Sequence, residues 1–303
     1  MKFSIALICA LLLLIPLNNN AADKKLNIVR TIAPQSDTDT AHLFFTDIIQ
    51  LALHKSQDKY GQSQLVLSTI SMTQGRWFRM LKNSIYLDII WGGANREREE
   101  IFTAIPIDLL GGILGVRALI IKKADRKKFS NITTMEQLKT LTACQAEHWP
   151  DTTILENAGL KILKVNKFEI NFKMLEKGRC DYFPRGIHEG YSEIEKYQIM
   201  WGNKLVIFDE FLLVYPFNMW FYVDNKNYAL ASQISYGLKQ AIKDGSFKTK
   251  LENHPITSHL FPLSKWGGKR LFLLKNAQQD LQATQDAWWL LKEFPFYKDI
   301  KFK

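Results

Sequence analysis

The chain has 303 residues, of which 47% are apolar and 23% are charged. This composition is typical of a globular protein and excludes a disordered chain, a coiled coil and a collagen-like fibre. The formal net charge of +10 is compatible with nucleic acid, a membrane surface or an anionic small ligand as the partner.

Residues 1–22 have the pattern of a cleavable secretory signal. Lys2 is followed by the apolar stretch 3–17, which is shorter than a typical membrane-spanning helix, and the small pair Ala21-Ala22 supplies a cleavage site. We therefore expect a periplasmic protein, and export argues against nucleic acid as a partner. Cleavage leaves about 280 residues, which is enough for two domains of about 150 residues each.

Two cysteines, Cys144 and Cys180, remain after cleavage, in a compartment that permits disulfides. A structural disulfide and two buried free thiols both fit this pattern. The spacing is not that of a zinc site, and we expect neither a metal nor a cofactor.

The first part of the chain alternates strand and helix. Its patterns predict a helix over residues 40–56 and a second helix opened by a capping box of Ser71 and Gln74. Strands are predicted over residues 26–31, 64–70 and 86–91. This order is typical of a parallel sheet with helices on its faces.

The same alternation begins again after a predicted capping box of Thr133 and Glu136. Gly159 and Gly178 are expected to end two helices, because glycine is common just past a helix end. The helices are predicted over residues 151–158 and 170–177, and the strands over residues 141–146, 160–165 and 180–183. These elements form a second α/β unit.

Two extended stretches, residues 115–123 and 212–224, are predicted to be strands that cross between the two units. A helix over residues 228–243 then returns to the first unit. We expect a first lobe of residues 23–118 plus 222–303 and a second lobe of residues 119–221, with the crossing strands at its ends. Residues 260–303 are expected to pack as helices on the first lobe.

Four stretches in this order resemble the periplasmic solute-binding proteins of family 3, which serve polar amino-acid importers. They are DIIWGGANREREEIF (88–102), ACQAEHWPDTTILENAG (143–159), MLEKGRCDYFPRG (174–186) and NYALASQISYGLKQAIKDGSFKTKL (227–251). The resemblance implies the α/β type II binding-protein fold: two lobes, each a mostly parallel sheet flanked by helices, joined by two crossing strands. A small solute would lie in the cleft, outside the carboxyl ends of the strands, and the lobes would close on it. It also implies a monomer that passes the solute to a membrane permease.

Arg98 matches the arginine with which this family grips the ligand carboxylate, a task that suits the guanidinium fork. Its spacing from Asp88 is shorter than in the family, so Arg96 is an alternative, and Asn95 lies in the same loop. The competing interpretation is that both arginines lie on a solvated helix turn.

Arg185 lies beside the place where amino-acid binders carry an aspartate for the ligand ammonium group. We expect Arg98 and Arg185 to face solvent from opposite lobes, which favours an anionic solute such as a dicarboxylate or an acidic amino-acid derivative. Glu189 is an alternative partner for an amine, which leaves a zwitterionic solute open. The competing interpretation is that Arg185 pairs with Asp181 or Glu189.

Five further residues are candidate ligand contacts. Gln145, His148 and Trp149 follow the first strand of the second unit, where a helix start favours an anion. Trp91 closes the third strand of the first unit, and Arg117 begins a crossing strand.

Catalytic motifs such as HExxH, GxSxG, a phosphate loop and CxxC are absent from the sequence. The expected function is therefore binding. The alternative is an exported enzyme on the same fold, of the cyclohexadienyl dehydratase type, with His188, Glu189 or His148 as acid or base. A sensory module that reports to a membrane receptor is a further alternative.

Overall fold

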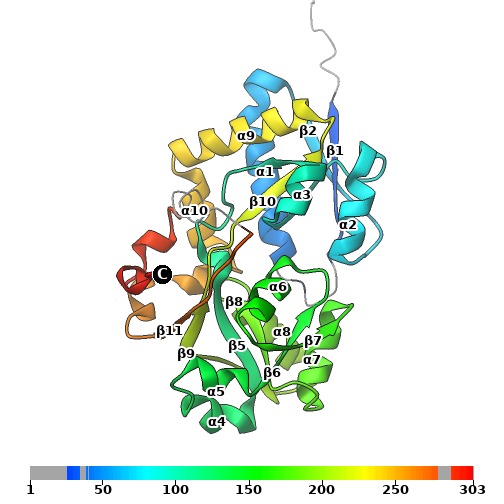
Figure 1. Ribbon diagram of the computed structural model, residues 1–303. Coiled ribbons are helices and arrows are strands. Elements are labelled where there is room, and N and C mark those ends of the chain that lie inside the picture. Colours follow the sequence, from blue (N-terminus) through cyan, green and yellow to red (C-terminus); the bar gives the residue numbers. More distant parts are fainter. Residues whose placement is uncertain (1–25, 35–38, 40, 279–287, 303) are drawn as a thin grey trace, which may run out of the picture.

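In a computed structural model, the described residues are 26–34, 39, 41–278 and 288–302. The predicted signal, residues 1–22, lies outside them. Figure 1 shows two lobes, one above the other, with the ribbon passing between them. None of the described helices combines the length and the apolar character that crossing a membrane requires.

The upper lobe in Figure 1 begins with the predicted alternation of strand and helix. Its first elements are β1 (Asn27–Thr31), α1 (Ala41–Tyr60), β2 (Ser63–Leu67), α2 (Gln74–Leu81) and β3 (Ile89–Gly93). The buried residues of α1, among them Phe44, Phe45, Ile48 and Ala52, recur at helical spacing and face the core. β1 pairs with β2 in parallel, and Asp88 N–H donates to the Arg30 carbonyl (2.8 Å), so β3 follows beside β1.

A three-stranded sheet, with one strand from a distant part of the chain, completes the upper lobe. β10 (Met219–Asp224) lies between β3 and β4 (Phe102–Ile105), antiparallel to both. Between β3 and β4 the chain forms α3 (Arg96–Ile101), and after β10 it forms α9 (Tyr228–Lys243), which has the predicted bounds, and α10 (Ser246–Asn253). α9 packs so closely on α1 that a Cβ at Gly237 would lie 1.9 Å from the Ala52 carbonyl oxygen. Glycine at this position allows the close approach.

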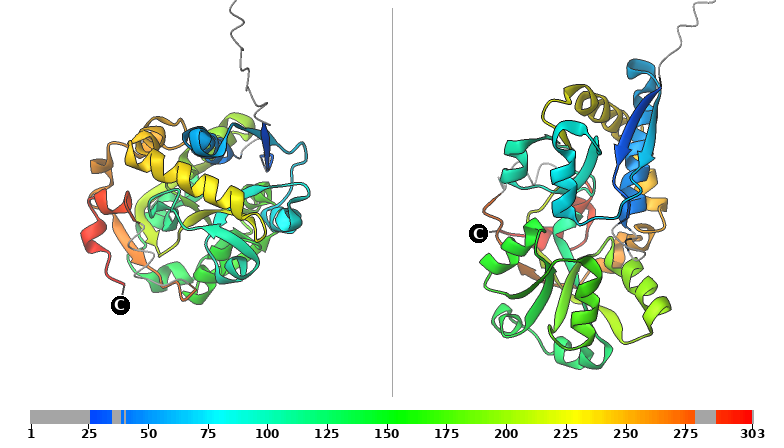
Figure 2. Two further views of the ribbon diagram at one scale, coloured as in Figure 1. Left: turned by 90° about the horizontal axis from the view of Figure 1, so that it is seen from above. Right: turned by 90° about the vertical axis from the view of Figure 1, so that its right-hand side faces the viewer.

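The lower lobe is built on a six-stranded mixed sheet in the order β11-β9-β5-β8-β6-β7. β5 is antiparallel to β8 and β9, and the other neighbours are parallel. Its strands are β5 (Val116–Lys122), β6 (Thr142–Ala146), β7 (Lys161–Val165), β8 (Tyr182–Gly186), β9 (Leu205–Val214) and β11 (Arg270–Leu273). Its helices are α4 (Arg126–Ser130), α5 (Met135–Lys139), α6 (Pro150–Asn157), α7 (Phe168–Glu176) and α8 (Gly190–Trp201). The views in Figure 2 show these helices around the sheet.

The chain crosses between the sheets through two connections. Residues 106–115 join β4 to β5, and residues 215–218 join β9 to β10. The prediction of one strand over residues 212–224 is therefore wrong: the ladder stops at Val214 and a new one begins at Met219. Pro216 lies in this break, and proline has no N–H to continue a ladder.

The C-terminal segment differs from the expected helices on the first lobe. β11 pairs in parallel with β9 and so extends the sheet of the lower lobe. Phe272 is buried there against the ring of Phe211, with centroids 4.8 Å apart. The described residues beyond β11 form short 3-10 turns, η6 (Leu291–Glu293) and η7 (Tyr297–Asp299).

Neither α2 nor α5 begins with the predicted capping box. α2 follows Thr73, whose side chain makes no capping hydrogen bond. At α5 the box consists of Thr134 and Gln137, one residue later than predicted. The Gln137 amide reaches back to the Thr134 N–H (3.1 Å), which the Glu136 side chain does not do.

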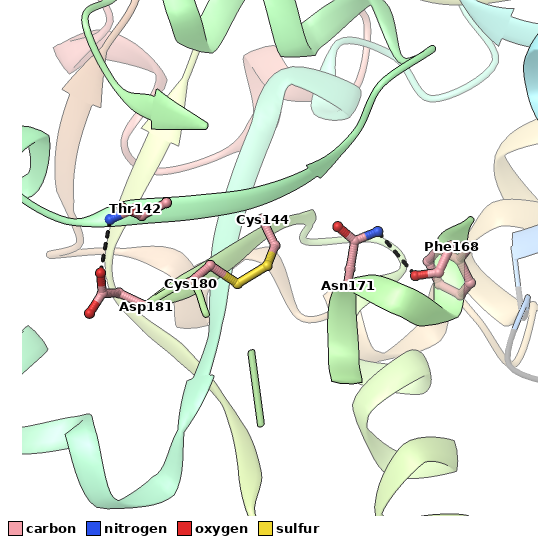
Figure 3. Close-up of a disulfide and its surroundings, with 6 residues drawn as sticks. All are labelled: Thr142, Cys144, Phe168, Asn171, Cys180 and Asp181. Atoms are coloured by element: carbon pink, nitrogen blue, oxygen red, sulfur yellow. Dashed lines mark hydrogen bonds between the residues drawn. A yellow bond between two sulfur atoms is a disulfide. The ribbon is translucent and has the colours of Figure 1, made fainter. Parts of the chain in front are cut away.

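Cys144 and Cys180 form a disulfide with Cα atoms 5.6 Å apart (Figure 3). It joins β6 to the residues just before β8. Nearby, the Thr142 N–H donates to the Asp181 carboxylate (2.9 Å) and ties the same two segments. Of the two alternatives for the cysteines, the structure therefore contains the disulfide.

Candidate functional site

A cavity of about 70 Å³ lies between the two lobes. The upper lobe contributes an aromatic and apolar wall that includes Phe45, Trp77, Trp91 and Met219. The lower lobe contributes a charged wall of Arg117, Asp151, Arg185, Glu189 and Glu193. Gly93 at the carboxyl end of β3 and Arg185 near that of β8 both line the cavity, and this is where ligands collect on α/β sheets.

Arg185 is held by carboxylates of its own lobe. Its Nε and Nη2 donate to the two oxygens of Glu193 (2.7 and 2.6 Å), and Nη2 lies 3.0 Å from Glu189. The guanidinium carbon also lies 4.7 Å from the Trp149 ring centroid and 5.2 Å from that of Phe183. The side chain is therefore enclosed by aromatic rings and carboxylates.

The expectation that Arg185 faces solvent is wrong, because the residue is 6% exposed. Of its two predicted partners, Glu189 lies within ion-pair distance, whereas Asp181 pairs with Lys128 (2.8 Å). Burial acts to lower the pKa of Arg185, but Glu189 and Glu193 outweigh it and raise the pKa. Arg185 is therefore charged, and its guanidinium group is already bonded to carboxylates of the protein.

Arg117, near the start of β5, is also bonded to carboxylates of the lower lobe. Its Nη2 donates to Asp151 (2.8 Å), its Nη1 to Glu189 (3.2 Å) and its Nε to the Tyr215 hydroxyl (2.9 Å). The Tyr215 hydroxyl in turn donates to Asp151 (3.0 Å). A continuous buried network therefore joins β5, α6 and the second connection to the cavity wall.

The two glutamates of this network differ in their protonation. Burial and the charge of Glu189 raise the pKa of Glu193 to about 7. Burial has the same tendency at Glu189, but Arg185, His188 and Arg117 outweigh it and lower its pKa. Three carboxylates of the wall thus face two guanidinium groups, so the wall carries no excess of positive charge.

Arg98 does not line the cavity. Its Nη1 donates to the Gly93 carbonyl (2.9 Å), and its Nη2 donates to Gln74 (2.8 Å) and to the carbonyl of His148 (3.2 Å). The last bond joins the upper lobe to the lower one. Burial lowers the pKa of Arg98 to about 10, so it stays charged at neutral pH. The loop residue Asn95 caps α3 by accepting from the Arg98 N–H (2.9 Å).

The other predicted ligand contacts divide into two groups. Trp91 and Trp149 line the cavity. The His148 ring packs instead on the upper lobe, 3.0 Å from where a Cβ of Gly75 would stand. Gln145 is buried within β6, and among the described residues its amide has no hydrogen-bond partner.

Sequence reasoning missed several cavity residues. Asp151 carried a usable signal, because it lies in the first turn of a helix that follows a strand end. Glu193 carried none, because α8 was not predicted. Among the described residues, no group of three or more His, Cys, Asp or Glu side chains is arranged to hold a metal ion.

His188, the predicted acid or base, is buried with its Nε2 3.4 Å from the Glu189 carboxylate. Burial lowers its pKa. Its ring is not among the groups that line the cavity, whereas Glu189 is.

Comparisons with known proteins agree with this architecture. No family model matches the chain and no curated protein matches it. A mutant of ArgBP from T. maritima matches with a TM-score of 0.52 at 16% identity, covering 76% of this chain and 95% of that one. A histidine kinase sensor domain with similarity to periplasmic binding proteins matches with a TM-score of 0.53 at 13% identity, covering 75% and 95%.

A third solved structure is an ancestral amino acid-binding protein described as a precursor of cyclohexadienyl dehydratase. It matches with a TM-score of 0.52 at 15% identity, covering 75% of this chain and 94% of that one. Identities this low establish the fold alone. The two lobes, the two connections and these matches confirm the expected likeness at that level, and the chain has the type II periplasmic binding-protein fold.

Proposed function

We propose that this protein binds a small solute in the cavity between its lobes. The observation that carries the proposal is that both lobes contribute walls to one cavity, and that these walls differ in chemistry. One is aromatic, with Phe45, Trp77 and Trp91, and the other is charged, with Arg117, Asp151 and Glu189. Small-ligand sites combine an apolar lining with a few placed polar groups in this way.

The volume and charge of the cavity favour a small zwitterion over a dicarboxylate. At about 30 Å³ for each water molecule, a volume of about 70 Å³ holds roughly two of them. Arg117 and Arg185 already bond carboxylates, so an incoming dianion would have to compete with Asp151, Glu189 and Glu193. An ammonium group would instead meet these carboxylates and the opposite aromatic wall, and aromatic rings can attract cations.

The role we propose is capture of an amino-acid-like solute in the periplasm by a monomer that delivers it to a membrane permease. The similarity in fold to a binding protein such as ArgBP supports this role. A sensory role, with a membrane receptor in place of the permease, is supported by the similarity to a sensor domain. Uptake of the solute by cells that lack this protein distinguishes the two, because it fails for an importer and persists for a sensor.

A thermal-shift screen tests the binding proposal. The panel contains small amino acids, primary amines and dicarboxylates, applied to the chain without residues 1–22. A solute that binds only the folded state stabilises it by about 2.7 kcal/mol at a hundredfold excess over its Kd. We expect a rise in melting temperature for a small zwitterion. A response to dicarboxylates alone would contradict the proposed solute class.

An enzyme of the dehydratase type is a second candidate, favoured by the approach of His188 to Glu189 (3.4 Å). The lowered pKa of Glu189 makes its carboxylate a weak base, which argues against this role. Any compound that raises the melting temperature should be recovered unchanged after prolonged incubation. A new product that disappears in the Glu189→Gln variant would establish the enzyme instead.

A further inference from the structure

The C-terminal segment contacts both connections between the lobes. At the first connection, the N–H groups of Leu290 and Leu291 donate to the Gly111 carbonyl (3.1 and 2.8 Å). The indole N–H of Trp289 donates to the carbonyl of Asp108 (3.2 Å). In Figure 1 the last residues, in red, lie at the side of the molecule near the junction of the lobes.

The same segment reaches the second connection through β11. The Leu274 N–H donates to the Val214 carbonyl (2.8 Å), which continues the pairing of β11 with β9. The Asn276 amide then donates to the carbonyl of Pro216 (2.9 Å), within the connection itself. One part of the C-terminal segment therefore bonds each of the two places where the chain passes between lobes.

The backbone of the first connection is shaped to receive this segment. Gly111 and Gly112 have φ values of 57° and 98°, a region that favours glycine. A Cβ at Gly112 would lie 2.5 Å from the Trp288 ring, and one at Gly111 would lie 2.6 Å from the Leu290 Cβ. Trp288 and Leu290 are fully buried. The contact is therefore closely packed.

The two connections are also bonded to each other. The Tyr215 N–H donates to the Gly115 carbonyl (3.1 Å), and the Leu109 N–H donates to the Met219 carbonyl (3.0 Å). The Asp108 carboxylate accepts from the Met219 N–H (3.1 Å) as well. A hinge motion of the lobes requires φ and ψ changes in these connections, and a segment packed on both resists such changes.

We propose that residues 270–278 and 288–302 form a strap that holds both connections and keeps the lobes closed in the absence of solute. The bond from Arg98 to the His148 carbonyl and the packing of the His148 ring on Gly75 show that the lobes are in contact. Two of the solved structures align over 76% and 75% of this chain, and each alignment covers 95% of the other protein. About a quarter of this chain therefore has no counterpart in the shared fold. The inference does not depend on the identity of the solute.

Pulsed electron paramagnetic resonance measures the distance between the lobes directly. Spin labels are placed on Lys127→Cys in α4 and Lys239→Cys in α9, two exposed positions on opposite lobes, with the Cys144–Cys180 disulfide left oxidised. Without solute, the otherwise unchanged protein should give one narrow distance distribution.

Two strap variants are compared with it. Trp288→Ala with Asn276→Ala removes the packing of a whole indole ring and a hydrogen bond, and the milder Trp289→Phe with Asn276→Ala removes two hydrogen bonds and keeps an aromatic ring in place. Both should broaden the distribution or shift it to longer distance, the first more than the second. Trp201→Ala, an exposed tryptophan on α8, is the control and should change nothing. A broad distribution in the parent protein would overturn the proposal, and so would distributions in both variants that match the parent in position and width. If the first variant fails to fold, the milder one alone decides.

Discussion

Replacement of Arg185 by methionine tests whether the charged wall of the cavity is also a structural network. Methionine keeps much of the apolar volume but removes the groups that donate to Glu193 at 2.7 and 2.6 Å. Glu193 is 1% exposed, so its carboxylate would lose its partner without gaining water. Breaking a buried ion pair by removing one partner costs about 3–5 kcal/mol, and we expect a loss of this size.

The assay is urea unfolding followed by circular dichroism, with Arg126→Met as a matched control. The Arg126 side chain is 50% exposed and lies 3.4 Å from Glu210, so its replacement should cost about 1 kcal/mol or less. Adding Glu193→Gln to Arg185→Met removes the unpaired carboxyl group and should restore part of the lost stability. The reasoning would be refuted if Arg185→Met cost no more than the control, or if the second substitution restored nothing.

Three further predictions concern stability. Gly115→Ala places a Cβ 1.8 Å from the Tyr215 carbonyl oxygen and should cost about 3 kcal/mol in urea unfolding; an unchanged midpoint would show that the connections can separate there. Reducing Cys144–Cys180, whose sequence separation is 36, should cost about 3–4 kcal/mol, and a melting temperature unaffected by reductant would contradict this. Burial raises the pKa of Asp108 to about 7, so the folded state retains a proton that the unfolded state releases above about pH 4. Asp108 should therefore lower stability between about pH 4 and 7, by up to about 4 kcal/mol, and Asp108→Asn should show a shallower fall in which the contribution of Glu193 remains; equal pH profiles for the two proteins would refute it.

The parts of the fold that could be predicted are those specified by local sequence. α9 has its predicted bounds because an apolar face at helical spacing follows Asn227, whose side chain caps the Leu230 N–H (3.3 Å). The capping box at α5 was misplaced by one residue, because Thr133 and Thr134 are adjacent and both have a suitable residue three positions later. Local patterns thus identify elements better than their ends.

The parts that could not be predicted depend on contacts between distant residues. β11 is four residues long and is stabilised as a strand by pairing with β9, in a register that joins Arg270 to Phe211. Arg185 was identified from the sequence, but its partner Glu193 lies on a helix that was not predicted. Without that partner, the sequence left two interpretations of Arg185 open, a ligand group facing solvent and an ion pair with Asp181 or Glu189. Whether the cavity favours an anion or a cation therefore could not be predicted from the sequence, because it depends on contacts between distant residues.

The central claim, that the cavity between the lobes binds a small solute, is tested most directly by filling the cavity. Ala41 begins α1 and lines the cavity, so Ala41→Leu adds three carbon atoms where the solute would lie. Isothermal titration calorimetry with the best zwitterion from the thermal-shift screen should give heat of binding with the parent protein and none with Ala41→Leu, while circular dichroism shows the variant folded. Equal affinity for the two proteins would contradict the account, because the solute would then bind elsewhere.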